Sequence, residues 1–149
     1  MDILPQFMAY ARDFEKTLAD DDWARLQRYF ASNAVYEVKA QSFGCRLVGG
    51  PAIFAGMKKS LDGFDRKFSR RDVEVTSGPE ISGDEMRMGW KVIYHRDGLP
   101  SFTLRGHSTV RYSGDQIVYL ADSYDPSVET EFAAWKRESG GIELDPSYT

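Results

Sequence analysis

Asp122 interrupts an apolar strand pattern and is the residue best placed to do chemistry. Within residues 116–124 (QIVYLADSY), Val118, Leu120, Asp122 and Tyr124 alternate, and alternate residues of a β-strand share one face. A buried carboxylate is costly unless it is paired, hydrogen-bonded or protonated. Surroundings that raise the pKa of a carboxyl are also where general acids and bases are found. The pattern predicts a cavity with a proton-transfer group, or alternatively a structural carboxylate held by hydrogen bonds.

Aromatic and apolar side chains on the other predicted elements are candidates for the wall of that cavity. Trp90 and Tyr94 share one face of a predicted strand, and Tyr36 lies on another strand. Such residues either line a pocket or fill a core. The candidate pocket residues are Phe14, Phe54, Met57, Trp90, Tyr94 and Tyr124.

Composition argues against several functional classes. The 149 residues carry a net charge of −4, and Lys and Arg are scattered, which argues against a nucleic-acid partner. The short basic run in residues 66–71 is predicted to be a solvated connection after a helix. With a single cysteine, Cys45, no intrachain disulfide can form. The two histidines lack zinc-binding spacing, so no metal site is predicted. The sequence also lacks a phosphate-binding motif, so no cofactor is predicted.

The sequence contains no run of membrane-spanning length, and its first residues lack a basic region followed by an apolar core. Together with the lone cysteine, this predicts a protein of the reducing cytoplasm with no membrane partner.

Periodicity predicts the elements that position these residues. Apolar positions at helical spacing indicate helices after Pro5, after Asp22 and from Gly50 to Gly63. A β-rich alternation indicates a strand over residues 34–39, followed by a loop through Gly44.

The second half of the chain alternates with period two, which predicts an antiparallel meander because long strands are joined by short turns. Its strands cover residues 72–76, 86–95, 101–112 and 116–124. A final amphipathic helix after Pro126 ends near Ser139. We therefore expect one domain over residues 1–139 and a loose tail over 140–149.

This order resembles the nuclear transport factor 2-like superfamily, in particular its SnoaL-like polyketide cyclases. The resemblance rests on residues 30–36 (FASNAVY), residues 50–53 (GPAI) and the pattern Ile117-x-x-x-x-Asp122-x-Tyr124-Asp125. It implies an α+β fold: a cone-shaped barrel of a curved antiparallel or mixed sheet, covered by N-terminal helices, with a C-terminal helix. It also implies a largely apolar pocket and a homodimer, but no single reaction.

In this resemblance, Asp122 stands at the position where the cyclases and the limonene epoxide hydrolases have the carboxylate of their general base. Tyr36 matches a tyrosine of the hydrolases. Other polar groups of the hydrolases are absent, since Val38 and Gly89 stand where asparagine and aspartate are expected. The cyclases pair the aspartate with a histidine, which His107 can supply.

The turn between the last two predicted strands decides whether His107 meets Asp122. A two-residue turn at Gly114-Asp115 puts His107 directly across from Asp122. A three-residue turn puts Gly106 there and turns His107 to the opposite face. The apolar alternation over residues 102–110 favours the second register, so both remain open.

Two functional hypotheses follow from these residues and the resemblance. The first is a cofactor-independent enzyme of the cyclase or isomerase type, acting on a small hydrophobic molecule that is polycyclic or bears a ketone. Asp122 is then the acid/base, His107 tunes it, and Tyr36 or Tyr94 hydrogen-bonds the developing enolate. The second is a non-catalytic module of the same fold that binds a small ligand or assembles as a dimer.

Overall fold

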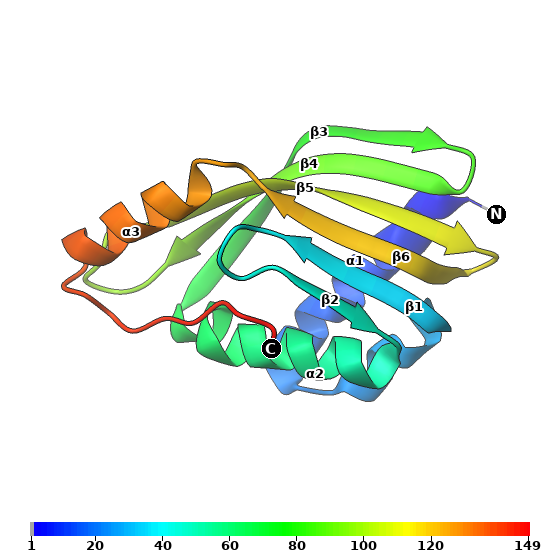
Figure 1. Ribbon diagram of the computed structural model, residues 1–149, viewed down its shortest axis with the longest axis horizontal. Helices are drawn as coiled ribbons and strands as arrows, with labels where there is room; N and C mark the ends of the chain where they lie inside the picture. The colour runs from blue at the N-terminus through cyan, green and yellow to red at the C-terminus, as the bar shows by residue number, and fades with distance from the viewer. Residues whose placement is uncertain (1) are drawn as a thin grey trace.

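A computed structural model describes residues 2–149 as a curved six-stranded sheet that wraps around helices (Figure 1). The helices are α1 (Ile3–Asp20), α2 (Gly50–Gly63) and α3 (Val128–Glu138), with short 3-10 helices η1 (Trp23–Tyr29) and η2 (Asp65–Lys67). The strands are β1 (Phe30–Lys39), β2 (Cys45–Val48), β3 (Arg70–Ser82), β4 (Glu85–His95), β5 (Phe102–Ser113) and β6 (Gln116–Tyr124). The predicted α+β fold, with its C-terminal helix, is confirmed.

The sheet is mixed and open, with strand order β2-β1-β6-β5-β4-β3. β1 pairs with β6 in parallel, and every other neighbouring pair is antiparallel. Figure 1 shows α1 and α2 on one side of this sheet and α3 at one end of it. β2 was not predicted, because four residues are too few to establish a period of two.

Helix α2 follows its predicted course. Pro51 stands in its first turn, where the missing N–H costs nothing. Ile53, Met57 and Leu61 lie at helical spacing and are buried. This apolar face holds α2 against the rest of the core. None of the helices within residues 2–149 combines the length and the apolar character that crossing a bilayer requires.

A bulge in β6 sets the register between β5 and β6. The turn has two residues, with Ser113 opposite Gln116, and Gly114 has the positive φ of 61° that such a turn favours. Tyr112 then pairs with Ile117, but Arg111 pairs with Tyr119, so Val118 is an extra residue. The bulge turns the even-numbered residues of β6 after it to the face of Tyr112.

This register differs from both predicted ones and corrects the position of His107. Ser108 lies opposite Asp122, while His107 lies opposite Ser123. Ser108 is buried and His107 is exposed on the other face of the sheet. His107 therefore does not enter the cavity. The physical reason is the bulge, because one inserted residue shifts every later pair by one.

Phe54 was predicted to line the pocket, and the structure corrects this. Its ring packs edge-on against Phe30 at 5.5 Å and lies 5.9 Å from the ring of Trp23. It is buried and is not among the residues that line the cavity. Phe54 therefore belongs to the core between α2 and η1. The prediction failed because helix periodicity does not distinguish a core position from a pocket position.

The segment over residues 140–149 has no helix or strand, yet it lies against α2 instead of being loose as predicted. Ser60 Oγ donates to the Pro146 carbonyl at 2.7 Å, and the Asp145 amide donates to the Gly63 carbonyl at 3.0 Å. A Cβ on Gly63 would collide with the Asp145 carbonyl. The glycine therefore permits a close approach that no periodic pattern announces.

Candidate functional site

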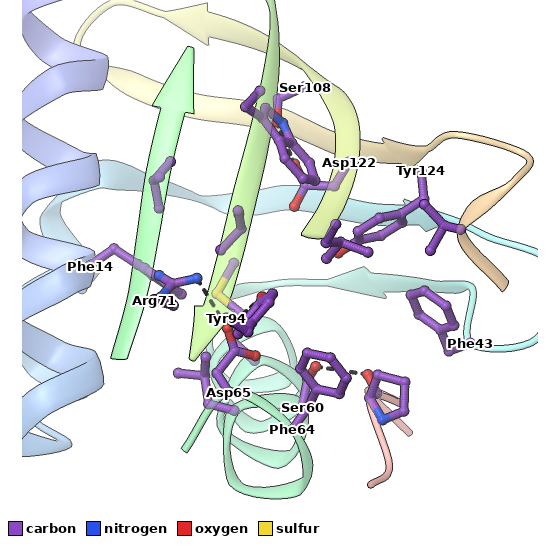
Figure 2. A pocket seen from close by; sticks show the side chains of 18 of the residues that line it. Phe14, Phe43, Ser60, Phe64, Asp65, Arg71, Tyr94, Ser108, Asp122 and Tyr124 are labelled. Atoms are coloured by element: carbon purple, nitrogen blue, oxygen red, sulfur yellow. Dashed lines mark hydrogen bonds and ion pairs between the residues drawn. The ribbon is translucent and has the colours of Figure 1, made fainter. Parts of the chain in front are cut away.

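A cavity of about 610 Å³ lies between the sheet and the helices. Its wall includes most of the predicted pocket residues, namely Phe14, Met57, Trp90, Tyr94 and Tyr124, and two of the predicted catalytic residues, Asp122 and Tyr36. Figure 2 shows the polar side chains of this wall separated by aromatic and aliphatic ones. An apolar cavity with a few polar groups is typical of small-molecule sites.

Asp122 accepts a hydrogen bond on each of its oxygens. Tyr36 Oη donates to Oδ2 and Ser108 Oγ donates to Oδ1, both at 2.6 Å. Trp90 Nε1 in turn donates to Ser108 Oγ at 2.8 Å. Three strands, β1, β4 and β5, thus hold the carboxylate of β6 in one orientation. Ser108 takes the place that the resemblance gave to His107.

Burial raises the pKa of Asp122 above its ordinary value, because the cavity solvates the charged carboxylate poorly. The hydrogen bonds from Ser108 and Tyr36, and the charge of His107 on the outer face, act in the opposite direction without cancelling the effect. Burial and the charge of Asp122 likewise raise the pKa of Tyr36 well above its ordinary value. Asp122 is therefore a stronger base than an exposed carboxylate.

Tyr148 brings a further hydroxyl to this site. Its ring packs edge-on against Tyr36 with centroids 5.7 Å apart, and it lines the cavity. Burial, and then the charge of Asp122, raise the pKa of Tyr148 to about 12. It stays protonated at neutral pH and is a hydrogen-bond donor. Tyr148 was not predicted, because it lies in the segment that was expected to be loose.

A second polar group lines the same cavity around Asp65. Tyr94 Oη and Arg71 Nη1 both donate to Asp65 Oδ2 at 3.0 Å, and Arg71 Nη2 donates to Glu15 Oε1 at 2.6 Å. Burial raises the pKa of Asp65, while the charge of Arg71 opposes the rise. Figure 2 shows the ion pair between Asp65 and Arg71.

The position of Arg71 corrects the prediction that the basic run at residues 66–71 is solvated. The side chain of Arg71 is only 13% exposed, whereas that of Arg70 is 66% exposed. Arg71 alternates with Val73 and Val75 along β3, and all three line the cavity. Extending the period-two pattern back from Val73 is the signal that would have found it.

Two other chemistries have little support among the residues that the structure describes. No group of three or more His, Cys, Asp or Glu side chains in residues 2–149 is arranged to hold a metal ion. The thiol of Cys45 is half-buried, and burial raises its pKa, which favours the unreactive protonated form.

Comparison with known proteins identifies the fold. No protein-family model matches the sequence, and no curated protein matches it. Among solved structures, a candidate isomerase from Bacillus subtilis superposes with a TM-score of 0.66 at 18% identity, covering 97% of this chain and 100% of its own. A nuclear transport factor 2-like protein of unknown function from Burkholderia pseudomallei has a TM-score of 0.61 at 14% identity, covering 89% and 96% of the two chains.

A candidate SnoaL-like polyketide cyclase from Shewanella denitrificans gives a TM-score of 0.62 at 14% identity, covering 85% of this chain and 96% of its own. The chain therefore has the nuclear transport factor 2-like fold, as the resemblance implied. Identities this low define the fold, and the function has to be argued from the site itself.

Proposed function

We propose that the protein catalyses a cofactor-independent proton transfer beside a carbonyl group of a small, largely apolar molecule bound in the cavity. The observation that carries the proposal is Asp122: a carboxylate of raised pKa, fixed by Tyr36 and Ser108 inside an apolar wall. The candidate isomerase and candidate polyketide cyclase of the same fold are consistent with it. The homodimer and the cytoplasmic location stay predictions.

In this reaction Asp122 removes a proton from the carbon next to the carbonyl. The electron pair of the C–H bond moves to the carbonyl, which becomes an enolate, and Asp122 later returns the proton to the same carbon or another one. Its raised pKa brings it closer to that of the carbon acid, which favours transfer. A hydrogen-bond donor has to stabilise the enolate oxygen.

The hydroxyl of Tyr148 is the donor that we assign to the enolate oxygen. Tyr36 and Tyr94, the donors expected from the sequence, already donate to Asp122 and Asp65. Tyr148 lies beside Tyr36 and faces the same cavity. Its raised pKa keeps the proton available for donation at neutral pH.

Exchange of α-protons for deuterium in the ketones 1-indanone and 1-tetralone tests this function directly. Proton NMR in D₂O measures the rate with wild-type protein and with Asp122→Asn. We expect Asp122→Asn to lower the catalysed rate by about 10²–10⁴-fold, because general-base catalysis contributes that much. Asp115→Asn, the same substitution at an exposed residue of the turn between β5 and β6, is the matched control and should leave the rate unchanged.

A non-catalytic binding module is the second candidate, and one observation favours it. Both oxygens of Asp122 already accept hydrogen bonds, as in a carboxylate whose role is to hold a wall in place. In that case the ketones bind, but wild type and Asp122→Asn exchange protons at the same rate. This result would refute proton transfer by Asp122.

A further inference from the structure

The cavity has two polar ends on the same face of β4. Trp90 donates to Ser108 beside Asp122, and Tyr94 donates to Asp65. These two aromatic residues are four positions apart on one strand, so their Cα atoms lie about 13 Å apart at roughly 3.3 Å per residue. Figure 2 shows Asp65 and Asp122 as members of separate groups of side chains.

The wall between the two ends is apolar. Val92 lies between Trp90 and Tyr94 on the same face of β4, and its partner on β5 is Leu104. Both side chains are buried and line the cavity. A polar group of a ligand held against Val92 and Leu104 loses its hydrogen bonds with water and gains none from these two side chains, which costs free energy.

The end of the cavity at Asp65, which we call the far end, has unused hydrogen-bonding capacity. Both side-chain hydrogen bonds to Asp65 go to Oδ2, and Oδ1 accepts none from another residue within the described part of the chain. Each terminal nitrogen of Arg71 donates one hydrogen bond, to Asp65 and to Glu15, and its Nε is buried without a partner among residues 2–149. Since two carboxylates surround one guanidinium, a further anion is repelled. A neutral hydrogen-bond donor fits this end best.

We propose that the cavity selects an elongated, mainly apolar molecule with a hydroxyl at the end remote from its reacting carbonyl, and that Asp65 accepts the hydrogen bond of that hydroxyl. Asp65 is then the residue that determines substrate specificity. The inference rests on the proposed function, because it extends the same ligand from Asp122 to the opposite end of the cavity.

Matched biphenyl probes test the far end by their different substituents. 4-Acetylbiphenyl, whose carbonyl cannot donate to Asp65, places hydrogen at the far position. 4-Acetyl-4′-hydroxybiphenyl places a hydroxyl there, and 4-acetyl-4′-methoxybiphenyl places an acceptor that cannot donate. Calorimetric titration measures their dissociation constants, and the corresponding terphenyls extend the series to longer molecules. We expect the hydroxy compound of at least one series to bind about tenfold or more tighter than both relatives, as a hydrogen bond to a charged acceptor allows.

Two variants test whether Asp65 causes the preference for a hydroxyl at the far end. Asp65→Asn, which removes the charge and keeps the size, should reduce the tenfold preference to about threefold or less, since a hydrogen bond to a neutral acceptor is weaker. Asp122→Asn should change the affinities of all probes by a common factor and leave the preference intact.

The outcomes separate the two proposals. If all three substituents bind equally in both series, or if the preference survives in Asp65→Asn, the inference about the far end is wrong while the proposed function stands. If no probe binds and no ketone exchanges its protons, the proposed function fails and the inference fails with it.

Discussion

Replacing Tyr36 with phenylalanine removes one of the two side-chain hydrogen bonds to Asp122. The Tyr36 hydroxyl donates to Asp122 Oδ2 at 2.6 Å. A hydrogen bond to a charged group contributes about 1.5–3 kcal/mol to stability and one between neutral groups about 0.5–1.5 kcal/mol. Tyr36→Phe should therefore cost about 1–1.5 kcal/mol more when Asp122 is ionised than when it is protonated. This difference corresponds to about a tenfold increase in the proton affinity of Asp122.

The loss of unfolding free energy caused by Tyr36→Phe changes with pH in a defined direction. In the wild type, burial raises the pKa of folded Asp122 above the unfolded value of about 3.9. The folded state then binds the proton more tightly than the unfolded state, so the free energy of unfolding falls as the pH rises from about 4 through the folded pKa. Tyr36→Phe raises the folded pKa further. We expect its unfolding free energy to fall more than that of the wild type across the same window.

Urea denaturation of four proteins at intervals between about pH 4 and pH 8 measures this effect: wild type, Tyr36→Phe, Asp122→Asn and the double variant. The amide that Asp122→Asn introduces cannot ionise, so the cost of Tyr36→Phe in that background should not depend on pH. Other titrating groups, including Asp65, are common to all four proteins and cancel in the cycle. A cost of Tyr36→Phe that is independent of pH in the wild-type background, or larger at low pH, would refute the raised pKa of Asp122.

Three further substitutions test other parts of the structure. Phe54→Ala should lower the free energy of unfolding by about 3–5 kcal/mol in urea denaturation, as expected for a buried core phenylalanine; a loss below about 1 kcal/mol would contradict its core position. Gly63→Ala should displace the segment at Asp145, seen as faster proteolytic cleavage after residue 140, and an unchanged cleavage rate would contradict the close contact. Arg71→Met leaves a buried carboxylate unpaired and should cost about 3–5 kcal/mol; adding Asp65→Asn should restore part of it, and no recovery would argue against the ion pair.

Periodicity predicted most of the fold and the central residue of the site. The strand over residues 116–124 has the predicted bounds, and α2 has the bounds predicted from its glycines and its apolar face. Asp122 was identifiable because one carboxylate in an apolar alternation is unexpected. Tyr36 was found by position in the resemblance, and its contact with Asp122 comes from the parallel pairing of β1 and β6.

The partners of Asp122 and the far end of the cavity could not be predicted, for physical reasons. The bulge at Val118 depends on how the sheet curves, so alternation alone gave His107 or Gly106 instead of Ser108. Asp65 lies in η2, a short charged segment without a period-two pattern, so only Arg71, by extending the alternation of β3 back from Val73, could have been placed on the cavity face. Tyr148 is held by contacts between α2 and residues far along the chain, which no local pattern contains.

Because the segment over residues 140–149 forms part of the cavity wall, its docking against α2 is coupled to ligand binding in the cavity. Leu144, Pro146 and Tyr148 form part of the wall, so a ligand that touches them binds only molecules in which the segment is docked. Its apparent affinity is then the intrinsic affinity multiplied by the docked fraction. By the same linkage, a bound ligand shifts the population towards the docked form and protects the segment from proteolysis. Changes to the contacts at Ser60 and Gly63 therefore alter ligand affinity, and through Tyr148 they also alter the supply of a hydrogen bond to the enolate oxygen.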